Sequence, residues 1–239
     1  ARRSTAATHV PVFVENIPID TQAQGSDLGQ VLERAVGINI RRSGGLGSFS
    51  TVSIRGSTAE QVQVFLDGIP LNQASGGGVN LGNIALGGIE DIEVYRGAVP
   101  ARFGGNSIGG VVHLRTRTER GPMHLRVETT VGSFGMRGMG ASLGGGYYRW
   151  NYLGLIDVNY SANSFRFWDD NGTEYNRVDD VWEQRQNADF KALRGLFKLG
   201  RPLASGQLEL HNTFDLSHKG IPGISNNQSL HTRFDSWRN

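Results

Sequence analysis

The sequence contains no cysteine, which excludes a disulfide framework and any thiolate metal site. Proline is scarce, with 7 residues in 239, and no apolar run approaches the ~18 residues of a membrane-spanning helix. Lysine and arginine (24) nearly balance aspartate and glutamate (22), and no basic block suggests a nucleic-acid partner. These absences do not exclude a membrane protein built from β-strands, because alternating barrel strands give only a weak hydropathy signal.

Signals for catalysis are also missing. The six histidines form no pair at metal-ligand spacing, and the chain has no nucleophile elbow and no Walker loop. We therefore expect no enzyme activity, no cofactor and no metal site. The abundant residue is glycine, whose 34 copies are about twice the average share and predict many tight turns and close backbone approaches.

Residues 10–118 are predicted to form a compact α+β domain. An alternating valine pattern at 10–14 predicts an opening strand, and Ser26 is the candidate cap of a helix ending at Gly37. The buried face of this helix is predicted to carry Leu28, Val31, Leu32 and Ala35. Further strands are predicted at 37–41, 51–55, 61–66, 89–95 and 111–116. Asp67 and Gly68 separate two apolar segments, which predicts a structural hairpin turn rather than a catalytic or metal-binding carboxylate.

Residues 122–239 have a different pattern, with longer strands that alternate apolar and polar residues. The alternation is clear at 124–131, 149–160 and 207–216, although Leu153 and Leu155 interrupt the polar side of the second segment. Short connections are predicted at 144–147 and 201–206, and a long, charged and aromatic loop at 163–186. This pattern is typical of outer-membrane barrel strands. A soluble antiparallel sandwich would also alternate and remains an alternative.

Five segments of the first half, at 26–40, 53–56, 62–72, 89–97 and 102–112, form an ordered set of motifs. They contain Ile-Arg-Gly at 54–56, Leu-Asp-Gly at 66–68, Tyr-Arg-Gly at 95–97 and Ile-Gly-Gly-Val-Val at 108–112. Each is weak alone, but in this order and at these separations the set resembles the plug domain of TonB-dependent outer-membrane receptors. His113 departs from the family, which usually has asparagine there.

The resemblance implies an α+β plug domain at 10–118, followed at 122–239 by antiparallel β-strands of a transmembrane β-barrel. The family's barrel has about 22 strands. This chain has room for only a few, so we expect an incomplete barrel, a fragment. The implied function is energy-coupled import of a scarce nutrient (a ferric siderophore, haem, cobalamin or a sugar) across the Gram-negative outer membrane. The implied partners are TonB, outer-membrane lipid and the small-molecule nutrient. A surface receptor or sensor without transport and a soluble β-rich interaction protein are the alternatives.

The resemblance also implies site residues. Arg55 and Arg96 are expected to pair with barrel glutamates, because a guanidinium in a partly desolvated interface needs a carboxylate partner. Two glycine-rich apical loops are expected to face the ligand through Arg42, Ser43, Gly44, Gly45, Ser48, Phe49, Asn72, Gln73, Ser75 and Asn80. The long loop, expected to be extracellular, presents Trp168, Asp169, Asp170, Tyr175 and Trp182. It lacks the bidentate glutamate of a calcium loop, so no metal is expected there.

Overall fold

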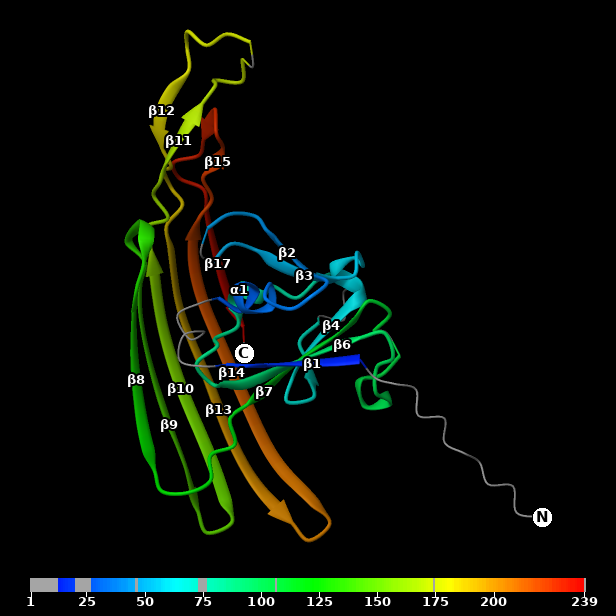
Figure 1. Ribbon diagram of the computed structural model, residues 1–239. Coiled ribbons are helices and arrows are strands. Elements are labelled where there is room, and N and C mark those ends of the chain that lie inside the picture. The colour runs from blue at the N-terminus through cyan, green and yellow to red at the C-terminus, as the bar shows by residue number, and fades with distance from the viewer. Residues whose placement is uncertain are drawn as a thin grey trace, which may run out of the picture.

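The computed structural model describes residues 13–19, 27–45, 47–72, 77–105, 107–173 and 175–238. A compact plug of short strands lies beside a tall, curved wall of long antiparallel strands (Figure 1). The α+β plug and the antiparallel barrel strands that follow it are both confirmed as predicted. No helix in the described part of the chain is both long enough and apolar enough to cross a bilayer.

The plug is built on a five-stranded sheet. Its order is β1 (Phe13–Pro18), β6 (Ile89–Arg96), β7 (Gly110–Thr116), β4 (Val62–Leu66) and β5 (Ile69–Pro70). Strands β4 and β7 are parallel, and the other neighbours are antiparallel. The helix α1 (Leu28–Leu32) and the hairpin of β2 (Ile38–Arg42) and β3 (Ser50–Ile54) complete the plug. The main core cluster includes residues from α1, β3, β4, β6 and β7.

Helix α1 buries the predicted face, but its ends differ from the prediction. Asp27 is the N-cap: its carboxylate accepts the amide of Gln30 at 2.7 Å, and the Gln30 side chain accepts the amide of Asp27 at 3.3 Å. The predicted cap, Ser26, lies outside the described residues. The helix ends at Leu32 rather than near Gly37, which instead has a φ of 75° in the turn that leads into β2.

The wall is a six-stranded antiparallel sheet. Its order is β17 (Arg233–Arg238), β14 (Gly206–Gly220), β13 (Phe190–Leu203), β10 (Trp150–Ser161), β9 (Arg137–Tyr147) and β8 (His124–Val131). At one end of the wall the chain forms two small hairpins, β11 (Arg166–Asp169) with β12 (Val181–Gln184), and β15 (Gly223–Ile224) with β16 (Asn227–Gln228). The β11–β12 hairpin rises above the rest of the molecule (Figure 1).

The two faces of the wall differ in polarity, as barrel strands require. Exposed apolar side chains such as Leu125, Val127, Ile156 and Leu210 lie on the outer face. Leu153 and Leu155, which interrupt the alternation of β10, face the plug: a methyl group added to Gly88 would meet Leu155 at 3.6 Å and Leu153 at 3.9 Å. The interruption therefore marks where the wall packs on the plug.

Three predicted connections need correction. Residues 144–147, predicted as a turn, belong to β9, and the reversal occurs between Tyr147 and Trp150, which pair across it. Residues 201–203 belong to β13, so the second turn is only residues 204–205. The long loop at 163–186 contains the β11–β12 hairpin. Glycine explains the first error, because a run without side chains carries no alternation.

Candidate functional site

A cavity of about 490 Å³ lies between the plug and the wall at the end where the small hairpins are. We call it the apical cavity. The plug contributes Ser43, Gly44, Gly45 and Ser48, all from the first predicted apical loop. The wall and its connections contribute Asn163, Phe165, Phe167, Arg185, Ala188, Phe190, Lys219, Gly220, Pro222 and Ser225. Loop residues of the plug and of the barrel half thus share one site.

Glycine allows the plug loop to lie close to the wall. At Gly47, which has a φ of 76°, an added methyl group would lie 2.2 Å from the ring of Phe190. At Gly45 it would lie 3.0 Å from the side-chain oxygen of Asn163. A side chain at Gly47 therefore combines backbone strain with a clash, and the loop needs glycine to reach the wall.

Asn163 fixes the point where the chain leaves the wall for the β11–β12 hairpin. It is buried and has a φ of 47°, a conformation that asparagine tolerates better than most residues. Its side-chain amide donates to the main-chain oxygen of Ala188 at 2.9 Å, and its side-chain oxygen accepts the hydroxyl of Ser161 at 2.8 Å. These bonds position the aromatic residues that follow.

Phenylalanine rings form the apolar side of the apical cavity. The ring of Phe165 lies between Phe134, at 5.8 Å, and Phe167, at 6.3 Å, and both contacts are edge-to-face. Phe190, at the start of β13, is almost fully buried beneath the plug loop. Rigid aromatic surfaces of this kind suit a flat apolar part of a ligand.

Two cations give the apical cavity positive charge. The Arg185 guanidinium donates to the main-chain oxygens of Gly223 and Ile224 and lies 5.7 Å from the ring of Phe167. The Lys219 ammonium lies 5.1 Å from the ring of Phe234. Within the described residues, neither cation pairs with a carboxylate. The positive charge is therefore available to an anionic ligand.

The predicted residues of the long loop form a separate aromatic hairpin. Trp168 and Trp182 pair across β11 and β12 with ring centres 5.4 Å apart, and both are about half exposed. Asp169 and Asp170 accept the amides of Asn171 and Gly172, each at 3.0 Å, and so stabilise the turn. Tyr175 is exposed. None of the five residues predicted here lines the apical cavity.

Several predicted apical residues are instead held by bonds within the plug. Arg42 pairs with Glu33 at 2.7 Å and with Asp27 at 3.2 Å. Asn72 accepts the amide of Val64 at 2.8 Å and thereby fixes the segment after β5. Asn80 accepts the amides of Ser50 and Gly82, at 3.1 Å and 3.2 Å. Phe49 is about half exposed, and Gln73 and Ser75 lie outside the described residues. Ligand contact by these residues stays a prediction.

The two predicted ion-pairing arginines differ in their surroundings. Arg96 pairs with Glu15 of β1 and donates to the main-chain oxygen of Val36, so its partners here lie in the plug. Arg55 has a φ of 51° and is exposed, and its side chain makes no ion pair with any described residue. Pairing of either arginine with a barrel glutamate stays a prediction.

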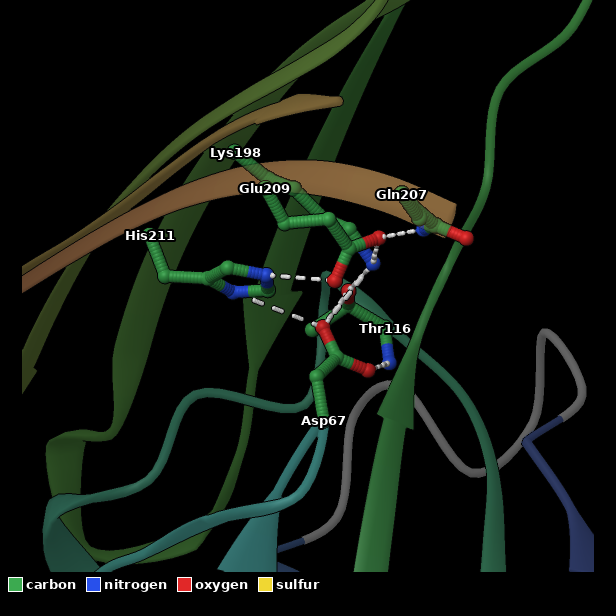
Figure 2. Close-up of polar contacts among 6 residues, drawn as sticks. All are labelled: Asp67, Thr116, Lys198, Gln207, Glu209 and His211. Carbon is green, nitrogen blue, oxygen red and sulfur yellow. Dashed lines mark hydrogen bonds and ion pairs between the residues drawn. The ribbon is translucent and has the colours of Figure 1, made fainter. Parts of the chain in front are cut away.

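Asp67 and Gly68, with φ values of 48° and 85°, form the turn between β4 and β5, as the sequence indicates. The Asp67 carboxylate accepts the amide of Thr116 at 2.8 Å and the Thr116 hydroxyl, and it pairs with Lys198 of the wall at 3.0 Å (Figure 2). Burial by itself raises the pKa of Asp67, but these hydrogen bonds and the Lys198 charge outweigh burial and hold the pKa below its ordinary value. The turn therefore holds an ionised carboxylate against the wall.

Sequence reasoning missed the wall residues that hold the plug. Lys198 and Arg194 lie four residues apart on the lumen side of β13, and Arg194 donates to the main-chain oxygen of Gly82 at 2.6 Å. The available signal was weak. It consisted of two cations an even number of residues apart, which places both on the same face of a strand that is otherwise mostly apolar. An ordinary polar lumen face would show the same pattern.

A plug beside a curved antiparallel wall, with a ligand-sized cavity between their loops, defines a plugged outer-membrane barrel receptor. Residues 4–111 match the family model described as the TonB-dependent Receptor Plug Domain. These residues form a plug domain of the TonB-dependent outer-membrane receptor family, as the motifs predicted, and the compartment of the chain is the outer membrane of Gram-negative bacteria.

Two curated relatives illustrate the sequence match. Vitamin B12 transporter BtuB of Vibrio vulnificus is 38% identical over 86 residues, which cover 36% of this chain and 14% of that protein. Vitamin B12 transporter BtuB of Photobacterium profundum is 34% identical over 123 residues, covering 52% of this chain and 20% of that protein. The chain thus spans a fifth or less of the length of these relatives, which are transporters rather than enzymes.

Solved structures support the same fold. The FrpB iron transporter of Neisseria meningitidis has a TM-score of 0.65 at 16% identity, over 89% of this chain and 33% of that chain. The ferric yersiniabactin uptake receptor FyuA of Yersinia pestis has a TM-score of 0.59 at 19% identity, over 87% of this chain and 32% of that chain. At such identities the likeness concerns the fold alone.

Proposed function

We propose that the chain forms the plug and part of the wall of a receptor that imports a scarce nutrient across the outer membrane with energy supplied through TonB. The apical cavity carries this proposal. Because Gly44 and Gly45 of the plug share it with Phe165 and Arg185 of the barrel half, a bound ligand would contact both parts. The apolar outer face of the wall would contact membrane lipid.

The chemistry of the apical cavity favours a ligand that combines flat apolar surface with negative charge. The phenylalanine side would pack against the apolar part, and Arg185 and Lys219 would attract the charge. A ferric siderophore of the aromatic, anionic type has both properties. The names of the structural neighbours, a ferric yersiniabactin receptor and an iron transporter, are in line with this class.

Cobalamin is the second candidate. It is favoured by the sequence relatives, which are named vitamin B12 transporters. Cobalamin also has a broad flat ring system that would suit the phenylalanine side of the cavity, but it has no net negative charge to engage both cations. The relative affinity for the two ligands therefore separates the candidates.

The test uses the full-length receptor that contains this chain. Calorimetry with ferric enterobactin and with cyanocobalamin would measure binding, and radiolabelled probes would measure uptake by cells with and without TonB. The proposal expects tighter binding of the ferric chelate and TonB-dependent accumulation. Tighter binding of cyanocobalamin would favour the second candidate. Binding without TonB-dependent accumulation would favour a receptor or sensor that does not transport.

A further inference from the structure

The turn between β4 and β5 enters a buried polar contact with the wall. Its members are Asp67 and Thr116 of the plug and Lys198, Glu209 and His211 of the wall, and we call this cluster the turn contact (Figure 2). Lys198 and His211 are direct partners across β13 and β14, so both side chains point into the lumen at one level. The side chains of Asp67, Lys198 and His211 are each at most 10% exposed.

The Lys198 ammonium is the centre of the turn contact. It lies 3.0 Å from Asp67, 3.0 Å from the Thr116 hydroxyl and 3.6 Å from Glu209. The His211 ring lies between the two carboxylates, with Nε2 3.2 Å from Glu209 and Nδ1 3.5 Å from Asp67. One lysine therefore bridges a carboxylate of the plug and a carboxylate of the wall.

The second polar contact between plug and wall, made by Arg194, is organised differently. Arg194 pairs with Asp215 at 3.2 Å and with Asp157 at 3.5 Å, and both carboxylates belong to the wall. From the described part of the plug, Arg194 receives only the neutral main-chain oxygen of Gly82. If the plug moved away, Arg194 would keep both carboxylates, whereas Lys198 would lose that of Asp67.

A buried ion pair suits a contact that has to open. While it is closed, it fixes the plug at one position, because a displaced plug would leave buried charges unpaired. Once water enters, hydration of the separated ammonium and carboxylate offsets most of their lost attraction. An apolar contact of the same size has no such compensation and costs more to expose to water.

We propose that the turn contact is the releasable attachment of the plug to this wall. In this inference, which rests on the proposed transport function, the lumen opens only after Asp67 parts from Lys198. Arg194 stays bound to Asp157 and Asp215 and keeps the wall intact. The retaining ion pair thus joins a plug carboxylate to a barrel cation, the reverse of the arginine–glutamate polarity expected from the sequence.

Ion current through the full-length receptor in planar lipid bilayers, with urea to loosen the plug, tests this proposal without a ligand or TonB. Lys198→Met removes the ammonium that bridges the carboxylates of Asp67 and Glu209 and leaves only the His211 ring between them. It should raise the frequency of openings at least about tenfold. Lys198→Arg should stay near wild type. So should Lys191→Met, because Lys191 is an exposed residue of the same strand that lies 5.9 Å from the ring of Tyr160.

A reversible cross-link provides the decisive comparison. The 239 residues contain no cysteine, so in a full-length receptor with any cysteine outside them replaced by serine, the double variant Asp67→Cys/Lys198→Cys can be bridged by a short bis-methanethiosulfonate reagent and checked by mass spectrometry. The unbridged variant should open readily, and the bridged one should stay closed until a reductant cleaves the bridge. Equal opening with and without the bridge would overturn the proposal, as would wild-type behaviour of Lys198→Met. Failed uptake of every probe would count against the transport function and leave this measurement readable.

Discussion

Arg194 of β13 donates a hydrogen bond of 2.6 Å to the main-chain oxygen of Gly82 in the plug. The same guanidinium lies between Asp157 of β10 and Asp215 of β14, its neighbours across the sheet. One side chain therefore ties three wall strands together and touches the plug. Replacing Arg194 should therefore destabilise the wall more than it weakens the attachment of the plug.

The first prediction concerns this residue. Arg194→Met leaves the carboxylates of Asp157 and Asp215 without their cation and should lower the free energy of unfolding by about 3 kcal/mol. Denaturant unfolding of the refolded full-length receptor measures the loss. Arg201→Met on the same strand removes a cation 5.1 Å from the ring of Trp150 and should cost about 1 kcal/mol or less. Equal losses for both variants would contradict the bridging role.

The second prediction concerns the fit of the plug loop. Gly47→Ala places a methyl group where the ring of Phe190 lies and strains a backbone with a φ of 76°. The loop should move off the wall and weaken binding of ferric enterobactin about tenfold or more. Gly154→Ala, where an added methyl meets no atom within 4 Å, is the control and should bind normally. If Gly47→Ala binds as tightly as wild type, the loop does not shape the site.

The third prediction concerns charge in the apical cavity. Arg185→Gln and Lys219→Gln each remove a cation that lacks a carboxylate partner among the described residues. Each should weaken binding of the anionic ferric enterobactin about tenfold and change binding of cyanocobalamin much less. For the wild-type receptor, added salt should weaken binding of ferric enterobactin and so reduce the difference between the affinities for the two probes. Equal effects on both probes would show that these cations act through packing and not through charge.

The fourth prediction concerns acid. Burial raises the pKa of Glu93, but hydrogen bonds from His113 and Tyr95 outweigh burial and hold the pKa below its ordinary value of 4.5. The folded plug therefore favours the charged form. Its contribution to stability is fully present above the ordinary pKa and is lost as pH falls through the lowered value.

Glu93→Gln should accordingly lower plug stability near neutral pH and make it fall less steeply in acid. Urea midpoints measured from about pH 7 down to about pH 3 check this slope. Asp67 has a lowered pKa as well and should leave part of the acid sensitivity in place. Burial raises the pKa of Asp91, so protonation of Asp91 favours the folded plug and partly offsets the loss of stability in acid. An unchanged slope in Glu93→Gln would exclude the network around Glu93 as a source of acid sensitivity.

Local sequence predicted most of the plug because its signals are short-range. The Asp67-Gly68 turn, the buried face of α1 and the apolar strands are each encoded by adjacent residues. In the wall, β8 was found because lipid on one face and water on the other enforce alternation. Strand β9 was not predicted because its glycines show no alternation of apolar and polar side chains. Strand β13 was not predicted because its lumen face contains both Leu196 and Lys198.

The candidate site was predicted only in part, since it depends on contacts between distant segments. The glycine loop at 43–48 was identified from the plug motifs. The residues opposite it, such as Phe190 and Lys219, lie more than a hundred positions later in sequences with no motif. Only the pairing of β13 with β10 and β14 brings them to the loop. A local sequence pattern does not predict a contact between segments so far apart in the chain.

The opposite polarity of the two wall faces has a consequence for assembly. Sliding β13 by one residue against its neighbours would turn Arg194 and Lys198 outward into hydrocarbon and bring Leu193 and Phe197 into the lumen. A cation at the centre of the bilayer costs about 2–4 kcal/mol on a barrel surface. The bilayer itself would thus disfavour a misaligned β13 during insertion of the wall, independently of the contacts between β13 and the plug.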